Sequence, residues 1–131
     1  MTVYGTCAME SLTLDVEKEG LLKVHSDYEV SALKTVWNSK EGLLTRDVWE
    51  ILNNQKNIRI SRASIINFLQ DMADKGILRA IEEPCKGGSR KRYYPKMTES
   101  EYKEYIVKTV IKSLMKDFDE TKEVLEQIIS N

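Results

Sequence analysis

The chain contains few of the residues that build metal sites and disulfides. Its 131 residues include two cysteines, Cys7 and Cys85, and one histidine, His25. These lie far apart and form no CxxC pair or Cys/His cluster with the spacing of metal ligands. We therefore expect no metal site and no cofactor. Two reduced thiols are favoured over a disulfide or a redox switch.

Long apolar runs are absent as well. None approaches the ~20 residues that a helix needs to cross a bilayer. Charged residues make up 31% of the chain and apolar residues 41%, which is typical of a soluble globular protein. The first residues lack the basic flank and apolar stretch of a secretory signal. We therefore expect a cytoplasmic protein that makes no contact with a membrane.

The residues that would form an active site are also lacking. The chain has one histidine, no Ser or Cys beside a plausible base, and no Gly-rich phosphate loop. Paired carboxylates occur only where they suit solvated helix faces. We expect a protein that is not an enzyme, and no small-molecule substrate is evident.

Positive charge is concentrated in the middle of the chain. The net charge is −1, but residues 43–96 carry 11 Lys and Arg against 6 Asp and Glu, a local net of +5. The segments before and after each carry −3. Because phosphate neutralisation supplies most non-specific affinity for DNA, this segment predicts a nucleic-acid partner despite the pI of 5.9.

Three helices are expected before a β-hairpin. The capping box Ser26-Asp27-Tyr28-Glu29 predicts the first helix, which the segment 38–42 closes. Leu43-Leu44 can form a short strand, and Thr45 is expected to cap a second helix over residues 46–54. Ser61 is expected to cap a third helix that Gly76 ends. Its apolar positions, at three- and four-residue spacing, are Ile65, Phe68, Leu69 and Met72.

The hairpin is predicted from two strand-like runs. Residues 77–82 and 90–94 suit strands, the Gly-Gly turn joins them, and Pro95 breaks the ladder. Together with the third helix, this order is that of a recognition helix followed by a basic wing. The candidate DNA-binding residues are Arg46, Arg59, Arg62, Ser64, Asn67, Lys86, Arg90, Lys91 and Arg92.

These features also have purely structural interpretations. Surface hairpins often carry Lys and Arg only to remain soluble or to discourage edge pairing. The combination of caps, Gly stop, hairpin and +5 segment favours nucleic-acid contact. Trp37 and Trp49 could stack on bases, but each lies on an apolar helical face, which favours core packing.

The C-terminal segment predicts a partner. Thr98-Glu99-Ser100-Glu101 is a second capping box, and no Gly or Pro follows it before Asn131. Apolar residues then alternate four and three residues apart, as in a coiled-coil seam. The alternative is a helix that packs on its own domain and bends near residues 117–119. The candidate dimerisation residues are Val107, Ile111, Leu114, Phe118, Leu125 and Ile128.

The first 24 residues are the least informative part of the chain. Residues 12–16 alternate like a strand and residues 21–24 could pair back on them, but a flexible leader fits equally well. We expect a mainly α protein with a minor β component. It has an N-terminal extension over 1–24, a winged helix-turn-helix over 25–97 with a small β-hairpin wing, and a long C-terminal helical dimerisation segment over 98–131.

Several short motifs resemble the penicillinase-repressor family of winged helix-turn-helix transcriptional regulators. The resemblance covers roughly residues 25–105. The matching runs are Asp27-Tyr28-Glu29-Val30, Val36-Trp37, Leu44-Thr45-Arg46-Asp47-Val48, Ser64-Ile65-Ile66-Asn67-Phe68-Leu69, Asp74-Lys75-Gly76-Ile77-Leu78, Arg92-Tyr93-Tyr94-Pro95, Thr98 and Glu101-Tyr102. The resemblance implies a homodimer that binds a palindromic operator and represses transcription.

The chain departs from the family in its regulatory features. Members that act on β-lactam resistance are cleaved at an Asn-Phe bond in the C-terminal region, whereas Asn67-Phe68 lies in the third helix of this chain. The copper-responsive branch uses a C-terminal cysteine cluster, and no cysteine follows Cys85. The third helix has Arg62-Ala63-Ser64 where many members differ, so the family's operator sequence cannot be assumed.

The expected function is therefore sequence-specific binding of double-stranded DNA by a homodimeric transcriptional regulator, a repressor. The alternative is a winged-helix protein-protein adaptor in a larger assembly, because this fold does not dictate DNA binding. An adaptor would not need cations gathered on the third helix and the wing.

Overall fold

The computed structural model describes residues 12–130. The chain forms two compact units, one that extends to Glu99 and one that begins at Ser100. Cys7 and the first part of the expected N-terminal extension lie outside the described residues. Among the described residues, no helix is both long and apolar enough to span a membrane.

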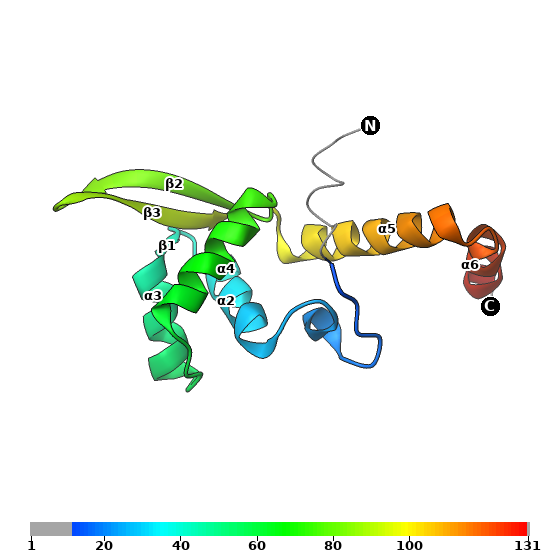
Figure 1. The fold of residues 1–131 in the computed structure, drawn as a ribbon, viewed down its shortest axis with the longest axis horizontal. Helices are drawn as coiled ribbons and strands as arrows, with labels where there is room; N and C mark the ends of the chain where they lie inside the picture. The colour runs from blue at the N-terminus through cyan, green and yellow to red at the C-terminus, as the bar shows by residue number, and fades with distance from the viewer. Residues whose placement is uncertain (1–11, 131) are drawn as a thin grey trace. The chain divides into compact units, whose positions relative to one another are not determined.

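The first unit contains helices and a three-stranded antiparallel sheet of order β1-β3-β2. Figure 1 shows the helices gathered at the end of the sheet where β1 joins, with the β2-β3 hairpin extending past them. The elements are η1 (Gly20–Lys23), α2 (Asp27–Trp37), β1 (Leu43–Leu44), α3 (Thr45–Glu50), η2 (Ile51–Gln55), α4 (Arg62–Asp74), β2 (Leu78–Cys85) and β3 (Gly88–Pro95).

Helix α2 begins as the capping box predicts. The Ser26 N–H donates to Glu29 Oε1 at 3.0 Å, and the helix ends at Trp37. The indole N–H of Trp37 donates to the carbonyl of Met97 at 2.9 Å. This bond ties the end of α2 to the segment that follows the hairpin, so Trp37 is a partly buried packing residue, as expected.

The start of α3 differs from the prediction. Thr45 is the first helical residue and Leu44 precedes it as N-cap, so Thr45 is not the cap. The Asp47 carboxylate instead accepts the Leu44 N–H at 3.1 Å, because an acceptor three residues into a helix can reach back to the cap backbone. The expected helix over 46–54 is also divided, since a π-helical turn, η2, follows Glu50.

Apolar residues on the inner faces of these helices form the core. Val48 and Leu52 of the second helical segment are fully buried, as are Leu33 and Val36 of α2. Helix α4 contributes its predicted positions Ile65, Phe68, Leu69 and Met72. The hairpin covers this core with Leu78 and Tyr93, each no more than 2% exposed. The sheet therefore fixes the wing directly on the helices.

The hairpin is longer than predicted. Its register pairs Cys85 with Gly88, so the turn consists of Lys86 and Gly87 alone. Pro95 is the last residue of β3 and lies opposite Leu78, at the end of the ladder. The register continues without a bulge, and it therefore places Glu83 opposite Arg90. Arg90, Lys91 and Arg92 consequently lie along β3, and only Lys86 of the predicted wing cations lies in the turn.

The described part of the N-terminal extension does not form the hairpin that was one of two interpretations. Residues 12–16 contain no strand. Most of the second expected strand forms η1, a short 3-10 helix whose Leu21 is buried. One backbone bond, from Asp15 N to Lys23 O at 2.8 Å, joins the two segments.

The second unit is helical but interrupted. Helix α5 (Glu99–Asp117) begins directly after Thr98, and α6 (Thr121–Ser130) begins after a break at residues 118–120. The expected apolar seam therefore does not run along one continuous helix. The Phe118 carbonyl accepts the Thr121 hydroxyl at 2.8 Å, a side-chain bond that occupies the backbone where the helix would otherwise continue.

Candidate nucleic-acid interface

The solvent face of α4 is the first part of the candidate interface. Helix α4 buries one face, so the side chains between the buried positions point outward. The exposed side chains include the predicted Arg62 and Asn67 and the unpredicted Ile66. No acidic residue lies in the first turn of α4. The positive end of the helix dipole is therefore open to an anion.

The segment before α4 is held in place by α3 and η2. The indole N–H of Trp49 donates to the Ile60 carbonyl at 2.8 Å. Asn53 also holds Ile60, because the Ile60 N–H donates to Asn53 Oδ1 at 3.4 Å. The adjacent Arg59 is exposed. These bonds position Arg59 at the leading end of α4.

Arg62 has a defined partner inside the unit. Its guanidinium lies 4.7 Å from the centre of the Trp49 ring. Such a cation-π contact orients the guanidinium plane without consuming its N–H donors. Trp49 is thus a partly buried packing residue, as expected, and it also positions Arg62.

Ser64 has a local role in the helix. Its N–H donates to Ser61 Oγ at 3.1 Å, which confirms Ser61 as the N-cap of α4. The Ser61 hydroxyl also bonds to the Ser64 hydroxyl at 2.9 Å. If Ser64 contacts DNA as predicted, its hydroxyl must do so while it is bonded to the hydroxyl of the cap residue, Ser61.

The three consecutive wing cations do not share one face of the hairpin. Side chains alternate along a strand, so Lys91 points away from Arg90 and Arg92. Lys91 Nζ donates to Gln70 Oε1 of α4 at 2.7 Å, whereas both arginines bond to Glu83 of β2. Lys91 therefore lies on the hairpin face beside α4, and the two arginines lie on the opposite face of the hairpin. Lys86 is exposed in the turn, and Arg46 is exposed on α3.

Glu83 neutralises much of the arginine charge. Arg92 Nε and Nη2 donate to its two carboxylate oxygens at 2.8 and 3.1 Å, and Arg90 Nε donates at 2.7 Å. These bonds, first from Arg92 and then from Arg90, lower the pKa of Glu83 from 4.5 to about 2. Arg92 also donates to the Gly42 carbonyl at 3.4 Å. Arg92 is thus a brace between β2 and the segment before β1.

Gln70 connects the wing to α4. Its Oε1 accepts from Lys91 and, at 3.3 Å, from the hydroxyl of Tyr93. Its Nε2 donates to Asp74 Oδ1 at 2.9 Å. Burial, and then the Asp74 charge, raise the pKa of Tyr93, so its phenol keeps the proton that it donates. The wing and α4 are therefore joined by side chains as well as by the core.

The roles of three residues in this region were not predicted from the sequence. Glu83 could have been found by counting back from a two-residue turn at Lys86-Gly87, which places it opposite Arg90. The exposed position of Ile66 follows from its place between the buried residues of α4. The contacts of Gln70 with the wing gave no signal in the sequence, because Lys91 and Tyr93 belong to a different element.

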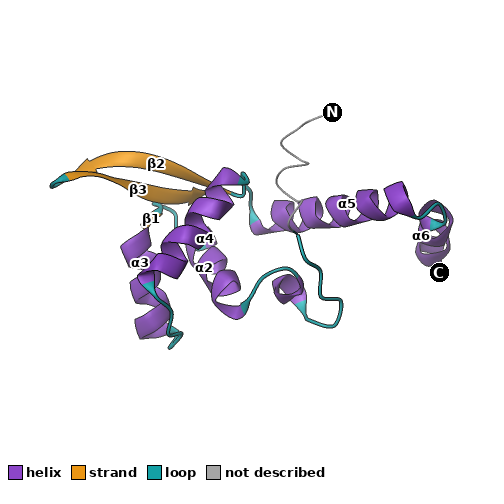
Figure 2. Ribbon diagram, viewed as in Figure 1, coloured by secondary structure: helices purple, strands orange, loops and turns teal. Residues whose placement is uncertain are grey.

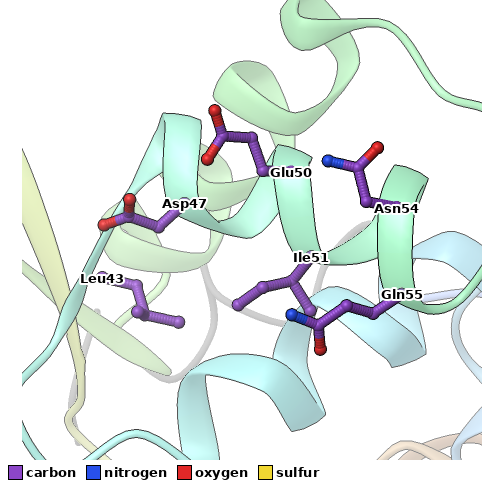
Figure 3. Close-up of a pocket in the computed structure, with 6 residues that line it drawn as sticks. All are labelled: Leu43, Asp47, Glu50, Ile51, Asn54 and Gln55. Atoms are coloured by element: carbon purple, nitrogen blue, oxygen red, sulfur yellow. The ribbon is translucent and has the colours of Figure 1, made fainter.

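A small pocket lies elsewhere on the first unit. It has a volume of about 370 Å³ and is lined by Leu43, Asp47, Glu50, Ile51, Asn54 and Gln55. Figure 3 shows these side chains coming from β1, α3 and η2, with Ile51 and Gln55 pointing toward the space beside Leu43. None of the predicted DNA-binding residues lines it. Its two carboxylates do not suit a polyanion.

Comparison with known proteins identifies the family. A model of the penicillinase repressor family matches residues 25–131, which includes α2 to α6. No curated protein matches the chain. Figure 2 shows the helices followed by a two-stranded wing that define the winged helix-turn-helix fold. The chain belongs to the penicillinase repressor family, whose members are DNA-binding transcriptional regulators and not enzymes.

Proposed function

We propose that this protein binds double-stranded DNA sequence-specifically, as a homodimer, and represses transcription from a palindromic operator. The observation that carries the proposal is the solvent face of α4, which presents Arg62 and Asn67, follows the exposed Arg59 and has no acidic residue in its first turn. An α-helix fits the major groove, where base edges differ among all four base pairs. Membership of a repressor family supports the same function.

The proposed contacts divide into positioning and reading. Arg59, at the leading end of α4, and Lys86, in the turn, contact phosphates, which fixes the protein on the duplex without reading sequence. Arg62 and Asn67 reach base edges, because Arg pairs with guanine O6 and N7, and Asn with adenine N6 and N7. Ser64 and Arg46 are further candidates, although the Ser64 hydroxyl is shared with the helix cap.

The wing contributes unequally to this proposal. Lys91 lies on the face nearest α4 and can reach a phosphate while its amine bonds to Gln70, since an ammonium has three donors. Arg90 keeps further N–H groups beyond the one bonded to Glu83 and is 41% exposed on its side chain. Arg92 is more enclosed, at 24%, and contributes mainly by bracing the hairpin.

Dimerisation is proposed through the second unit. The predicted residues Val107, Leu114, Phe118 and Ile128 are exposed, with exposed fractions between 39% and 64%. Ile111 and Leu125 are half-buried. Exposed apolar side chains at this density mark an interaction surface. A second copy of the chain would cover them and would place two reading helices on a two-fold symmetric operator.

The adaptor alternative has one observation in its favour, which is the neutralisation of Arg90 and Arg92 by Glu83. An adaptor would bind a protein and show no preference among duplexes. The two functions are separated by selecting bound sequences from a random duplex pool. A repressor enriches one motif with two-fold symmetry, whereas failure to retain any duplex at low salt would reject the proposal.

The phosphate contacts are tested by the salt dependence of binding to the selected duplex. We expect Arg59→Ala to weaken binding to specific and random duplexes alike, and to reduce the slope of log K against log salt by about 1, because one phosphate contact is lost. The matched control is Lys18→Ala, an exposed cation of the N-terminal extension. Fluorescence anisotropy titrations measure both. An Arg59→Ala slope equal to that of Lys18→Ala would exclude Arg59 from the interface.

A further inference from the structure

Ile66 is an apolar residue on the face of α4 that would enter the major groove, where side chains that contact base edges are needed. It is 48% exposed on α4, although the adjacent Ile65 is fully buried. Single exposed apolar side chains are common on protein surfaces and need no explanation in themselves. The position of Ile66 is what makes it informative, because Arg62 and Ala63 precede it by four and three residues on the same face and Asn67 follows it.

The charge around Ile66 favours a nucleic acid over an apolar protein partner. Arg62 is the first residue of the same helix and Arg59 lies in the segment just before it, while Lys91 bonds to Gln70, one turn after Ile66. A protein partner for one isoleucine would require these cations to be paired or buried. A duplex meets them with phosphates and meets the centre of the helix with base edges.

Only one of the four standard bases offers an apolar group in the major groove. Thymine carries a C5-methyl group there, whereas guanine, adenine and cytosine present hydrogen-bond donors or acceptors at the corresponding edges. The Ile66 side chain has no polar atom. Against any other base edge it would exclude water from groups that it cannot bond, which is unfavourable. Against a thymine methyl it buries apolar surface on both sides.

We propose that Ile66 reads a thymine through its C5-methyl group and so selects an A·T pair at one defined position of each half-site. The inference rests on the proposed function and adds a specificity-determining residue to it. Arg62 and Asn67 select by hydrogen bonds, and Ile66 selects by shape and apolar contact. The recognised chemical group is the 5-methyl group itself, so 5-methylcytosine presents the same feature as thymine.

The test uses the duplex that the full-length protein selects from the random pool. Each thymine of one half-site is replaced in turn by deoxyuridine, which lacks only the methyl group. For the unsubstituted protein we expect one position at which this change weakens binding about fourfold, the factor for losing one buried methyl group. With Ile66→Ala, we expect the same change to have no effect. Replacing that thymine by cytosine should weaken binding, and 5-methylcytosine should restore part of the loss only when Ile66 is present.

Ile81→Ala is the matched control. Ile81 is 44% exposed but lies on β2, on the hairpin face that carries Glu83. We expect this variant to keep the full deoxyuridine effect. Circular dichroism melting verifies that each variant is folded, and Ile66→Val, which keeps an apolar branched side chain, should retain the methyl preference.

The outcomes separate this inference from the function on which it rests. If the unsubstituted protein binds a selected duplex but no thymine is sensitive to loss of its methyl, the role of Ile66 is wrong and DNA recognition stands. The same conclusion follows if Ile66→Ala keeps the deoxyuridine effect. If the pool yields no bound sequence, the proposed function fails, and the reading role of Ile66 fails with it.

Discussion

At the scale of single residues, Glu83 determines how the wing displays its charge. It lies opposite Arg90 and diagonal to Arg92, and it binds both. A carboxylate shared by two guanidinium groups keeps them oriented, but it also competes with any phosphate for their donors. The hairpin therefore has fewer available positive charges than its sequence suggests. Its structure depends in part on the charge state of one acid.

We expect this dependence to appear as a pH effect on stability. Arg92 and Arg90 lower the pKa of Glu83 to about 2, below the 4.5 usual for the unpaired side chain. A depressed pKa means that the folded state binds its proton less readily than the unfolded state. The stabilisation by Glu83 is therefore complete above about pH 4.5, and it is lost as the pH falls toward 2.

The measurement is urea unfolding of the original protein and of Glu83→Gln, followed by tryptophan fluorescence between pH 6 and pH 2.5. Glu83→Gln should be the less stable at pH 6, and the two unfolding free energies should converge as the pH falls. Glu82→Gln is the control, because it removes a neighbouring carboxylate and keeps both arginine pairs. A difference between the original protein and Glu83→Gln that stayed constant over this range would contradict the assignment.

Gly42 shows how one residue permits two elements to meet. Its φ is +78°, and a Cβ atom at this position would lie 2.6 Å from Cε2 of the Tyr94 ring. Gly42 immediately precedes β1, and β1 pairs with β3, which contains Tyr94. The absence of a side chain thus allows the first strand to join the hairpin.

Gly42→Ala is expected to destabilise the protein more than Gly20→Ala does. Both glycines have positive φ, of +78° and +58°, so both variants incur a backbone penalty of about 1–2 kcal/mol. Only at Gly42 must an aromatic ring also move, which adds about 1–3 kcal/mol. Gly20 has no other heavy atom within 4 Å of the added Cβ. Thermal and urea unfolding of the two variants provide the comparison, and equal losses would show that the Tyr94 ring adjusts freely.

At the scale of elements, the helices could be predicted and their irregularities could not. Periodicity and caps gave α2 and α4 because each has a polar cap and a one-sided apolar face. The π-helical turn η2 left no pattern in the sequence, since its apolar residues fit an α-helix equally well. The break before α6 depends on a bond from the Thr121 hydroxyl to a backbone carbonyl, which periodicity does not report.

The candidate site was predictable to a similar extent. Arg59, Arg62 and Asn67 lie on an exposed helix end or face as the sequence suggests. The division of Lys91 from Arg90 and Arg92 required the strand register, which the sequence leaves open until the turn length is known. Side-chain pairs between elements, such as Lys91 with Gln70, depend on the tertiary arrangement.

The exposed apolar side chains of α5 carry the prediction on assembly. Leu114→Glu places a charge where a second copy would cover an apolar surface, so we expect the dimer to dissociate into folded monomers. The matched control is Ser113→Glu, the adjacent exposed residue of the same helix and outside the seam. Sedimentation velocity distinguishes the two states. A Leu114→Glu protein that remained dimeric would remove α5 from the proposed interface.

At the scale of the whole molecule, charge is arranged by segment. Residues 43–96 hold a net of +5, in a chain whose total is −1. The acidic segments before and after them have no favourable interaction with a polyanion. If a duplex binds as proposed, this distribution favours the face of α4 and the wing over the acidic segments, and so one orientation of binding over many. The total charge bears on solubility, whereas the distribution of charge along the chain bears on which partner the protein binds.

The break at residues 118–120 has a consequence for how two copies would align. An unbroken heptad repeat looks the same after a shift of seven residues, so paired helices of this kind can slip along each other. A break in each helix prevents such slippage, because only one alignment places the two breaks opposite each other. Two copies that paired through their second units would therefore do so in one register, without the slippage open to an unbroken repeat.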